Sequence, residues 1–210
     1  MKKILFIGAG GHFKEVFVWY LDQVKQKGMK SEIKGIVDDD KIHLKQEPLT
    51  KLKIYKFQEI KMTNDLYFIL AIGKMSIRKK IIEKYQNLNF ETCIHPTSVI
   101  SKNCVYKKGN LFGPNTVIAG DCKLGSFNNF SQNSTASHDC IIGDNNFFSP
   151  SSSIMGSCQI GKNNFFGVSS NMIPGVNIEN DNVIGANSTI IKSLNTNNNT
   201  LIGVPAKVKK

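Results

Sequence analysis

Residues 142–172 read IGDNNF FSPSSS IMGSCQ IGKNNF FGVSSN M, and each block of six opens with an apolar residue. The same phase holds from Ile94 to Ile190, where no charged residue takes the opening position. A unit this short cannot bury its apolar side chain alone and must stack on its neighbours. The repeat therefore predicts a left-handed parallel β-helix, a triangular prism with three hexads per turn. An antiparallel β domain is the alternative, but no hairpin pattern would keep one phase over this length.

The fifth residue of each hexad has a small or compact side chain. Taken in steps of eighteen, these residues form three ladders: one mainly of Ser and Thr, one mainly of Cys and one of Asn. We expect the asparagines to hydrogen-bond from coil to coil inside the prism, because a buried polar ladder is stable only when satisfied. The cysteines are expected to be reduced fillers. These two ladders include Asn128, Asn146 and Asn164, and Cys104, Cys122, Cys140 and Cys158.

The glycines that follow the inward residues, together with the asparagines, are expected to form corners with positive φ. These glycines are Gly113, Gly125, Gly143, Gly161, Gly167 and Gly185.

The first 93 residues instead alternate strands with helices. Apolar runs predict strands at 3–8, 34–37 and 66–72, and helices are expected at 11–28 and from Ser76, as the N-cap, to about Asn87. This order predicts a small α/β domain with a Rossmann-like parallel sheet. We therefore expect two domains, residues 1–93 and 94–210.

The composition indicates a cytoplasmic protein without membrane insertion, because no apolar run approaches the roughly 18 residues of a membrane span and no signal peptide is recognisable. The net charge is +11. Nucleic acid is disfavoured as a partner because the chain has no RNA- or DNA-binding motif, so phosphorylated small molecules are the better candidates.

A glycine-rich turn, Gly8-Ala9-Gly10-Gly11-His12, follows the first strand and opens a helix. Backbone amides at such a helix start can bind phosphate. Phe13 stands where the dinucleotide fingerprint requires glycine, and Asp38 comes too late in the sequence for its acidic residue, so a nicotinamide cofactor is disfavoured. The remaining interpretations are a tight turn without a ligand, or a mononucleotide loop. In the second case Asp38 or Asp39, in the run Asp38-Asp39-Asp40, would bind base or ribose, with Gly73 at the next strand end.

His138 interrupts the hexad pattern in the sequence Ala136-Ser137-His138-Asp139-Cys140. A corner side chain projects outward, and the adjacent carboxylate can hold the imidazole in one tautomer and make it more basic. His138 is therefore a candidate general base, and the alternative is an ordinary surface histidine.

Six motifs occur here in the same order as in the PglD/NeuD-like sugar acetyltransferases: IGAGGH (7–12), VDD (37–39), AIG (71–73), IRKK (77–80), HDCIIG (138–143) and IGVPAK (202–207). The chain resembles this family from end to end. The resemblance implies a nucleotide-activated amino sugar bound in the N-terminal domain and acetyl-CoA bound along the β-helix. It also implies a cleft between subunits of a homotrimer and no metal.

Carried over by position, the resemblance implies His138 as the base and Asp139, where relatives often have Glu, as its acidic partner. Substrate contacts fall on Gly10, Gly11, His12, Asp38, Asp39 and Gly73, and acetyl-CoA contacts on Phe147, Gly156, Val168 and Ala186. Two positions depart from a related enzyme, which has His at the position of Phe147 and Gly at that of Ala186.

The expected activity is transfer of acetyl from acetyl-CoA to the amine of a UDP-, dTDP- or GDP-4-amino sugar in bacterial surface glycan biosynthesis. A sialic acid O-acetyltransferase of the NeuD type and a non-catalytic nucleotide-sugar-binding or scaffold protein are the alternatives. A β-helix metalloenzyme would need three converging histidines, and the repeat region holds only His95 and His138.

Overall fold

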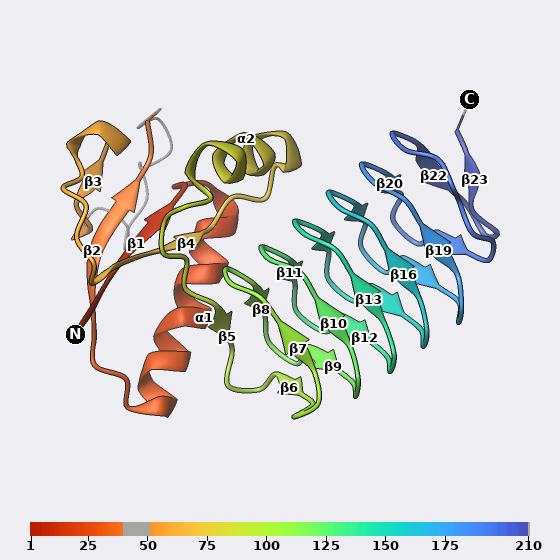
Figure 1. Ribbon diagram of the computed structural model, residues 1–210, viewed down its shortest axis with the longest axis horizontal. Helices are drawn as coiled ribbons and strands as arrows, with labels where there is room; N and C mark the ends of the chain where they lie inside the picture. The colour runs from red at the N-terminus through yellow and green to blue at the C-terminus, as the bar shows by residue number, and fades with distance from the viewer. Residues whose placement is uncertain (40–50, 210) are drawn as a thin grey trace. The chain divides into compact units, whose positions relative to one another are not determined.

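The computed structural model describes residues 1–39 and 51–209, so Asp40 of the expected acidic run lies outside the described residues. The chain folds as two compact units, Met1–Pro96 and Thr97–Lys210. Figure 1 shows the first as a sheet with helices and the second as a stack of short strands. Among the described helices, none combines the length and the apolar character that crossing a membrane requires.

The first unit is built on a four-stranded parallel sheet in the order β3-β2-β1-β4, as the strand and helix pattern predicts. The strands of this sheet are β1 (Lys2–Ile7), β2 (Ser31–Val37), β3 (Ile54–Tyr55) and β4 (Leu66–Leu70). The helices of the unit are α1 (Gly11–Lys27), α2 (Met75–Tyr85) and the 3-10 helix η2 (Phe57–Glu59). The short strand β5 (Cys93–Ile94) follows them. The sequence pattern did not indicate β3, which is only two residues long.

The prediction of Ser76 as a helix cap is wrong. Helix α2 begins at Met75, and Lys74 is its N-cap without a side-chain capping bond. The Lys74 carbonyl already accepts hydrogen bonds from the amides of Ile77 and Arg78, both at 3.0 Å, so Ser76 lies inside the first turn.

One face of helix α1 forms the core of this unit with the sheet. Phe13, Trp19 and Tyr20 of α1 are buried. The ring of Phe6 on β1 meets Phe13 and Tyr20 edge-on, with centroids 5.3 and 5.8 Å apart. This packing places the start of α1 directly after the carboxyl end of β1.

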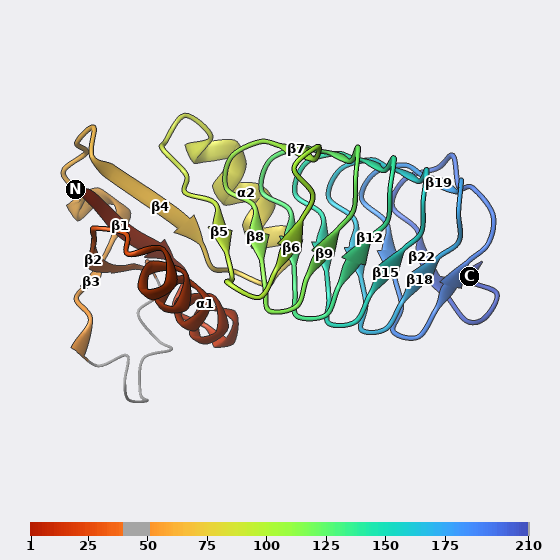
Figure 2. The same ribbon diagram turned by 90° about the horizontal axis from the view of Figure 1, so that it is seen from below.

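The second unit is the predicted left-handed parallel β-helix, with three faces of two-residue strands (Figures 1 and 2). Each strand from β6 to β18 pairs in parallel with the strand eighteen residues further on, as in Thr135↔Ser153, whereas β20 pairs with β22 seventeen residues on. The antiparallel strand β23 follows β22 at the C-terminal end.

The first face holds β6 (Val99–Ile100), β9 (Val117–Ile118), β12 (Thr135–Ala136), β15 (Ser153–Ile154), β18 (Asn171–Met172) and β21 (Thr189–Ile190). The second holds β7 (Val105–Tyr106), β10 (Lys123–Leu124), β13 (Ile141–Ile142), β16 (Gln159–Ile160) and β19 (Asn177–Ile178). The third holds β8 (Leu111–Phe112), β11 (Asn129–Phe130), β14 (Phe147–Phe148), β17 (Phe165–Phe166), β20 (Val183–Ile184), β22 (Thr200–Ile202) and β23 (Lys207–Val208).

The residues that open the hexads fill the axis of the prism, which confirms the predicted phase. From Phe112 to Ile190 all of them are buried. Phe112, Phe130, Phe148 and Phe166 form one continuous stack with centroid spacings of 5.5, 4.4 and 4.8 Å. Each coil therefore buries its apolar side chain against the coils before and after it.

The asparagine ladder is confirmed. The backbone N–H of Asn146 donates to Asn128 Oδ1, and that of Asn164 donates to Asn146 Oδ1, both at 2.9 Å. The side-chain amide of Asn146 also donates to the Gly161 carbonyl at 2.9 Å. The cysteines are free and buried as expected, and burial raises the pKa of Cys104 to about 11.

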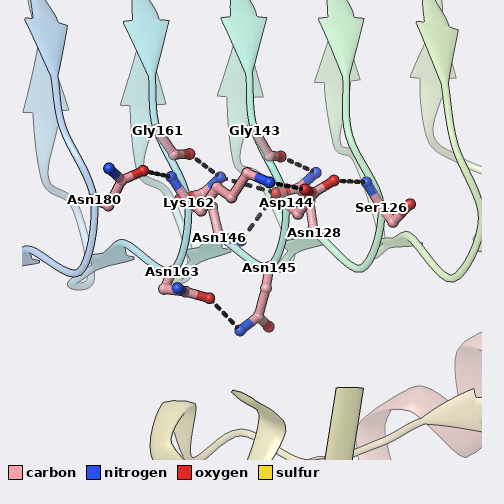
Figure 3. A network of polar contacts seen from close by, with 10 residues as sticks. All are labelled: Ser126, Asn128, Gly143, Asp144, Asn145, Asn146, Gly161, Lys162, Asn163 and Asn180. Carbon is pink, nitrogen blue, oxygen red and sulfur yellow. Dashed lines mark hydrogen bonds and ion pairs between the residues drawn. The ribbon is translucent and has the colours of Figure 1, made fainter. Parts of the chain in front are cut away.

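A second polar row runs along the surface at the same corner (Figure 3). The Asp144 carboxylate accepts the Ser126 N–H at 2.8 Å and pairs with Lys162 Nζ at 2.8 Å. The Lys162 N–H in turn donates to Asn180 Oδ1 at 2.7 Å. The asparagine ladder inside the prism and this outer row of Asp144 and Lys162 thus bind successive coils together with polar contacts.

The expectation for the corner glycines is corrected. Positive φ recurs every six residues from Gly109 to Asn187, mostly at Asn, Asp and Ser rather than at the six glycines. The glycines serve close approach between coils instead, because a Cβ on Gly143 would lie 2.6 Å from the Gly161 carbonyl oxygen. The asparagine part of the expectation holds, as at Asn133 (φ +58°).

Replacing Asn146 with Ala should lower the free energy of unfolding by about 2 kcal/mol or more, since each buried polar group left unsatisfied costs about 1–3 kcal/mol. Chemical denaturation measures the change, with Gln159→Ala on the exposed side of β16 as the control. A loss no larger than that of the control would contradict a stabilising role for the ladder.

Candidate functional site

A cavity of about 500 Å³ opens at the carboxyl ends of β1, β2 and β4 in the first unit. Its wall brings together all six residues expected to contact substrate: Gly10, Gly11, His12, Asp38, Asp39 and Gly73. Carboxyl ends of parallel strands are the usual ligand site of an open α/β sheet. The sequence motifs therefore converge on one pocket, although they lie up to 63 positions apart in the chain (73 − 10).

The glycines of the turn have different structural reasons. Gly8 has φ +99°, and a Cβ there would meet Ile72 Cγ1 at 2.4 Å, so this position requires glycine. A Cβ on Gly10 or Gly11 would meet no heavy atom within 4 Å outside the adjoining residues. These two glycines leave the start of α1 open to the cavity, where helix amides can bind an anion.

Both acids of the pocket also hold its wall together. Asp38 Oδ2 accepts the Ala9 N–H at 2.8 Å, and Asp39 Oδ1 accepts the Phe57 N–H at 3.1 Å. From the sequence we expected one of these carboxylates to bind a base or ribose. In the structure, one oxygen of Asp38 binds the loop at Ala9 and one oxygen of Asp39 binds the start of η2, which fixes the direction of both carboxylates.

His12 lies on the first turn of α1 with its side chain largely covered. Its Nδ1 is 3.0 Å from Glu15 Oε2, and its ring meets Trp19 edge-on. A Cβ on Gly73 would lie 3.6 Å from His12 Cβ, so the end of β4 and the start of α1 approach each other closely here.

Three apolar residues of the wall were missed by sequence reasoning: Phe57, Ile77 and Ile81. The i, i+4 spacing of Ile77 and Ile81 on α2 was the available signal. The position of Phe57 in the wall follows from β3, the preceding strand, which the sequence pattern did not indicate. Beside them the fully buried Arg78 donates from Nη1 to the Ile72 carbonyl at 3.0 Å, and burial lowers the pKa of its guanidinium to about 9.

In the second unit, His138 stands at a corner of the prism with 67% of its side chain exposed. Its Nδ1 lies 2.8 Å from Asp139 Oδ2. Asp139 has φ +61°, and its N–H donates to the Gly120 carbonyl of the preceding coil. The corner therefore places the carboxylate beside Nδ1, which favours the tautomer that carries its proton there and leaves a lone pair on Nε2.

The four residues expected to contact acetyl-CoA are not gathered in one place within the chain. Gly156 occupies the corner of His138 one coil later, whereas Val168 and Ala186 share another corner of the prism. Phe147 lies on the face formed by β14 and is 8% exposed, with its ring stacked on Phe165 at 5.6 Å. The side chain of Phe147 is thus engaged in packing.

In the described ranges 1–39 and 51–209, no three His, Cys, Asp or Glu side chains converge to hold a metal ion.

Residues 3–85 match the family described as the PglD N-terminal domain. No protein of curated function matches the chain at a significant level. Among solved structures, the chain is similar to PerB from Caulobacter crescentus in complex with CoA and GDP-perosamine. The identity is 27%, the TM-score is 0.82, and the match covers 100% of this chain and 98% of PerB.

The acetyltransferase domain of PglB from Neisseria gonorrhoeae has the same fold, with 23% identity, a TM-score of 0.86 and full coverage of both chains. The domain match and the full-length similarity to PerB agree with the six motifs of the sequence. The match of residues 3–85 to the PglD N-terminal domain and the full-length similarity to PerB support a PglD-like sugar acetyltransferase.

Proposed function

We propose that the protein transfers acetyl from acetyl-CoA to the amino group of a nucleotide-linked amino sugar. The observation that carries the proposal is the His138–Asp139 pair, held at 2.8 Å on an open corner of the β-helix. PerB, similar over its whole length, was crystallised with CoA and GDP-perosamine, which supports an amine rather than a hydroxyl acceptor.

His138 acts as the general base. Its Nε2 takes a proton from the sugar amine as the nitrogen attacks the thioester carbonyl, the C–S bond breaks, and the proton passes to the CoA sulfur. The Asp139 carboxylate keeps the proton of the neutral imidazole on Nδ1. The Gly156 N–H, which makes no hydrogen bond with another described residue, is the donor that we assign to the developing oxyanion.

The cavity of the first unit binds the nucleotide part of the acceptor. The open start of α1 at Gly10 and Gly11 suits a diphosphate, because helix amides there point at an anion. Asp38 and Asp39, already oriented by the Ala9 and Phe57 amides, are placed to accept hydrogen bonds from ribose or base.

The His138→Ala variant should lose roughly 10²–10⁴ in kcat, the usual contribution of a positioned general base. Asp139→Asn should cost less, because it only weakens the orientation of the imidazole. Thiol release from acetyl-CoA with a panel of nucleotide-4-amino sugars and a free sialic acid measures both variants and the acceptor class. A His138→Ala enzyme with half of the wild-type kcat would contradict the role of base, and acetylation of the sialic acid alone would contradict the amine acceptor.

Crystal structures of perosamine N-acetyltransferase with one histidine changed to Asn or Ala still contain CoA and GDP-perosamine. We therefore expect the His138→Ala variant to keep its affinity for both substrates.

The Gly11→Val variant should raise KM for the sugar nucleotide far more than KM for acetyl-CoA. A Cβ on Gly11 meets no neighbouring atom, so the fold tolerates the added side chain, and Gly11 lines the cavity that the side chain would narrow. Loss of ground-state binding appears in KM. Asp38→Ala should act in the same direction, with an added effect on the loop at Ala9. Equal increases for both substrates would mean that the cavity does not bind the nucleotide.

The protein should be a homotrimer. His138 and Gly156 lie at one corner of the prism and Val168 and Ala186 at another, and a closed ring can bring such different corners of two neighbours together. Val99 and Val117, paired on β6 and β9, also leave 61% and 40% of their surface exposed, as expected for an interface. Light scattering that found a fully active monomer at assay concentration would contradict this assembly.

A further inference from the structure

Gly156 lies directly against the imidazole of His138. A Cβ built on Gly156 would stand 2.6 Å from His138 Cε1, 2.7 Å from Nε2 and 3.1 Å from Nδ1. Carbon atoms do not approach a ring this closely, so the face of the imidazole rests on the space that a side chain would take. The two residues are eighteen positions apart and follow one another along the same corner.

The need for glycine at this position does not come from the backbone. Gly156 is not among the residues with positive φ, which along this corner are Asp121, Asp139, Ser157 and Gly175. It also differs from Gly125, Gly143 and Gly161, whose close contacts include the backbone of the next coil. What an added methyl group on Gly156 would meet is the His138 ring.

The corner holds His138 from two sides. The Ser157 N–H donates to the His138 carbonyl at 2.9 Å, which fixes the backbone of the histidine against the next coil. Asp139 holds Nδ1 at 2.8 Å. With 67% of the side chain exposed, little else restrains the ring, so it can swing into solvent when the space over Gly156 is filled.

We infer that Gly156 is a positioning residue for the general base: its missing side chain lets the His138 ring lie flat on the corner, with Nδ1 toward Asp139 and Nε2 toward the acceptor amine. This inference rests on the proposed function for its catalytic consequence. Its geometric part, the position and tautomer of the imidazole, stands apart from catalysis. This positioning role belongs to the missing side chain of Gly156. It is separate from the oxyanion contact assigned to the Gly156 N–H, because any residue but proline would retain that N–H.

The test is Gly156→Ala in the full-length protein, because alanine keeps the N–H and adds only the Cβ. We expect kcat to fall on the order of 10²-fold, the typical cost of misplacing a reacting group by about 1 Å, while KM for the sugar nucleotide stays unchanged. The matched control is Gly120→Ala at the same corner one coil earlier. A Cβ there meets only Ser101 Oγ at 3.7 Å, an ordinary contact, and activity should be retained.

Two further measurements separate positioning from other roles. In a His138→Ala background, Gly156→Ala should cause no additional loss of kcat, because the ring that it displaces is gone. Nitrogen-15 NMR of the histidines should find mainly the Nδ1–H tautomer of His138 in the wild type and a mixture in Gly156→Ala.

An unchanged tautomer in Gly156→Ala would overturn the inference whatever the activity, and so would a further tenfold loss in the His138→Ala background. If His138→Ala alone were active while the tautomer shifted as expected, the proposed base would be wrong and the placement of the ring by Gly156 would stand.

Discussion

From β6 to β21 the coils of the β-helix pair at a spacing of eighteen residues, and this register is the constraint on which the rest of the second unit depends. The asparagine ladder, the phenylalanine stack and the outer Asp144–Lys162 row all follow it. Because the register is constant, position in the sequence decides the corner at which a side chain emerges. His138 can therefore rest on Gly156 only because the two differ by one full turn.

The same regularity explains why the second unit could be predicted from sequence nearly residue by residue. A period of six tells which side chains point into the prism and which point out of it, without reference to any distant contact. The burial of the asparagines and cysteines therefore followed directly from the period. The purpose of the corner glycines did not follow, because glycine suits both positive φ and close approach. The φ values and the short distance from a Cβ on Gly143 to the Gly161 carbonyl separate the two reasons.

The cavity of the first unit was predictable in outline only. The Gly10–His12 turn and the acids after β2 are local motifs with a known chemical use, and they do line one cavity. Phe57 depends on β3, too short to leave a pattern. The bonds from Ala9 to Asp38 and from Phe57 to Asp39 depend on how loops from separate strands meet, which no periodicity encodes. Roles that rest on tertiary approach, like that of Gly156, are likewise invisible in the sequence.

The last turn of the β-helix abandons the regular spacing. Asn199 continues the asparagine ladder one residue early, bonded to Asn182 at a separation of 17, and β23 then runs antiparallel to β22. A growing stack of parallel strands ends in unpaired backbone groups that could template another chain. Here the terminal strand reverses direction and carries Lys207, with Lys209 directly after it. On this face of the prism the sheet thus ends in a charged, antiparallel strand, which disfavours edge-to-edge pairing with another chain.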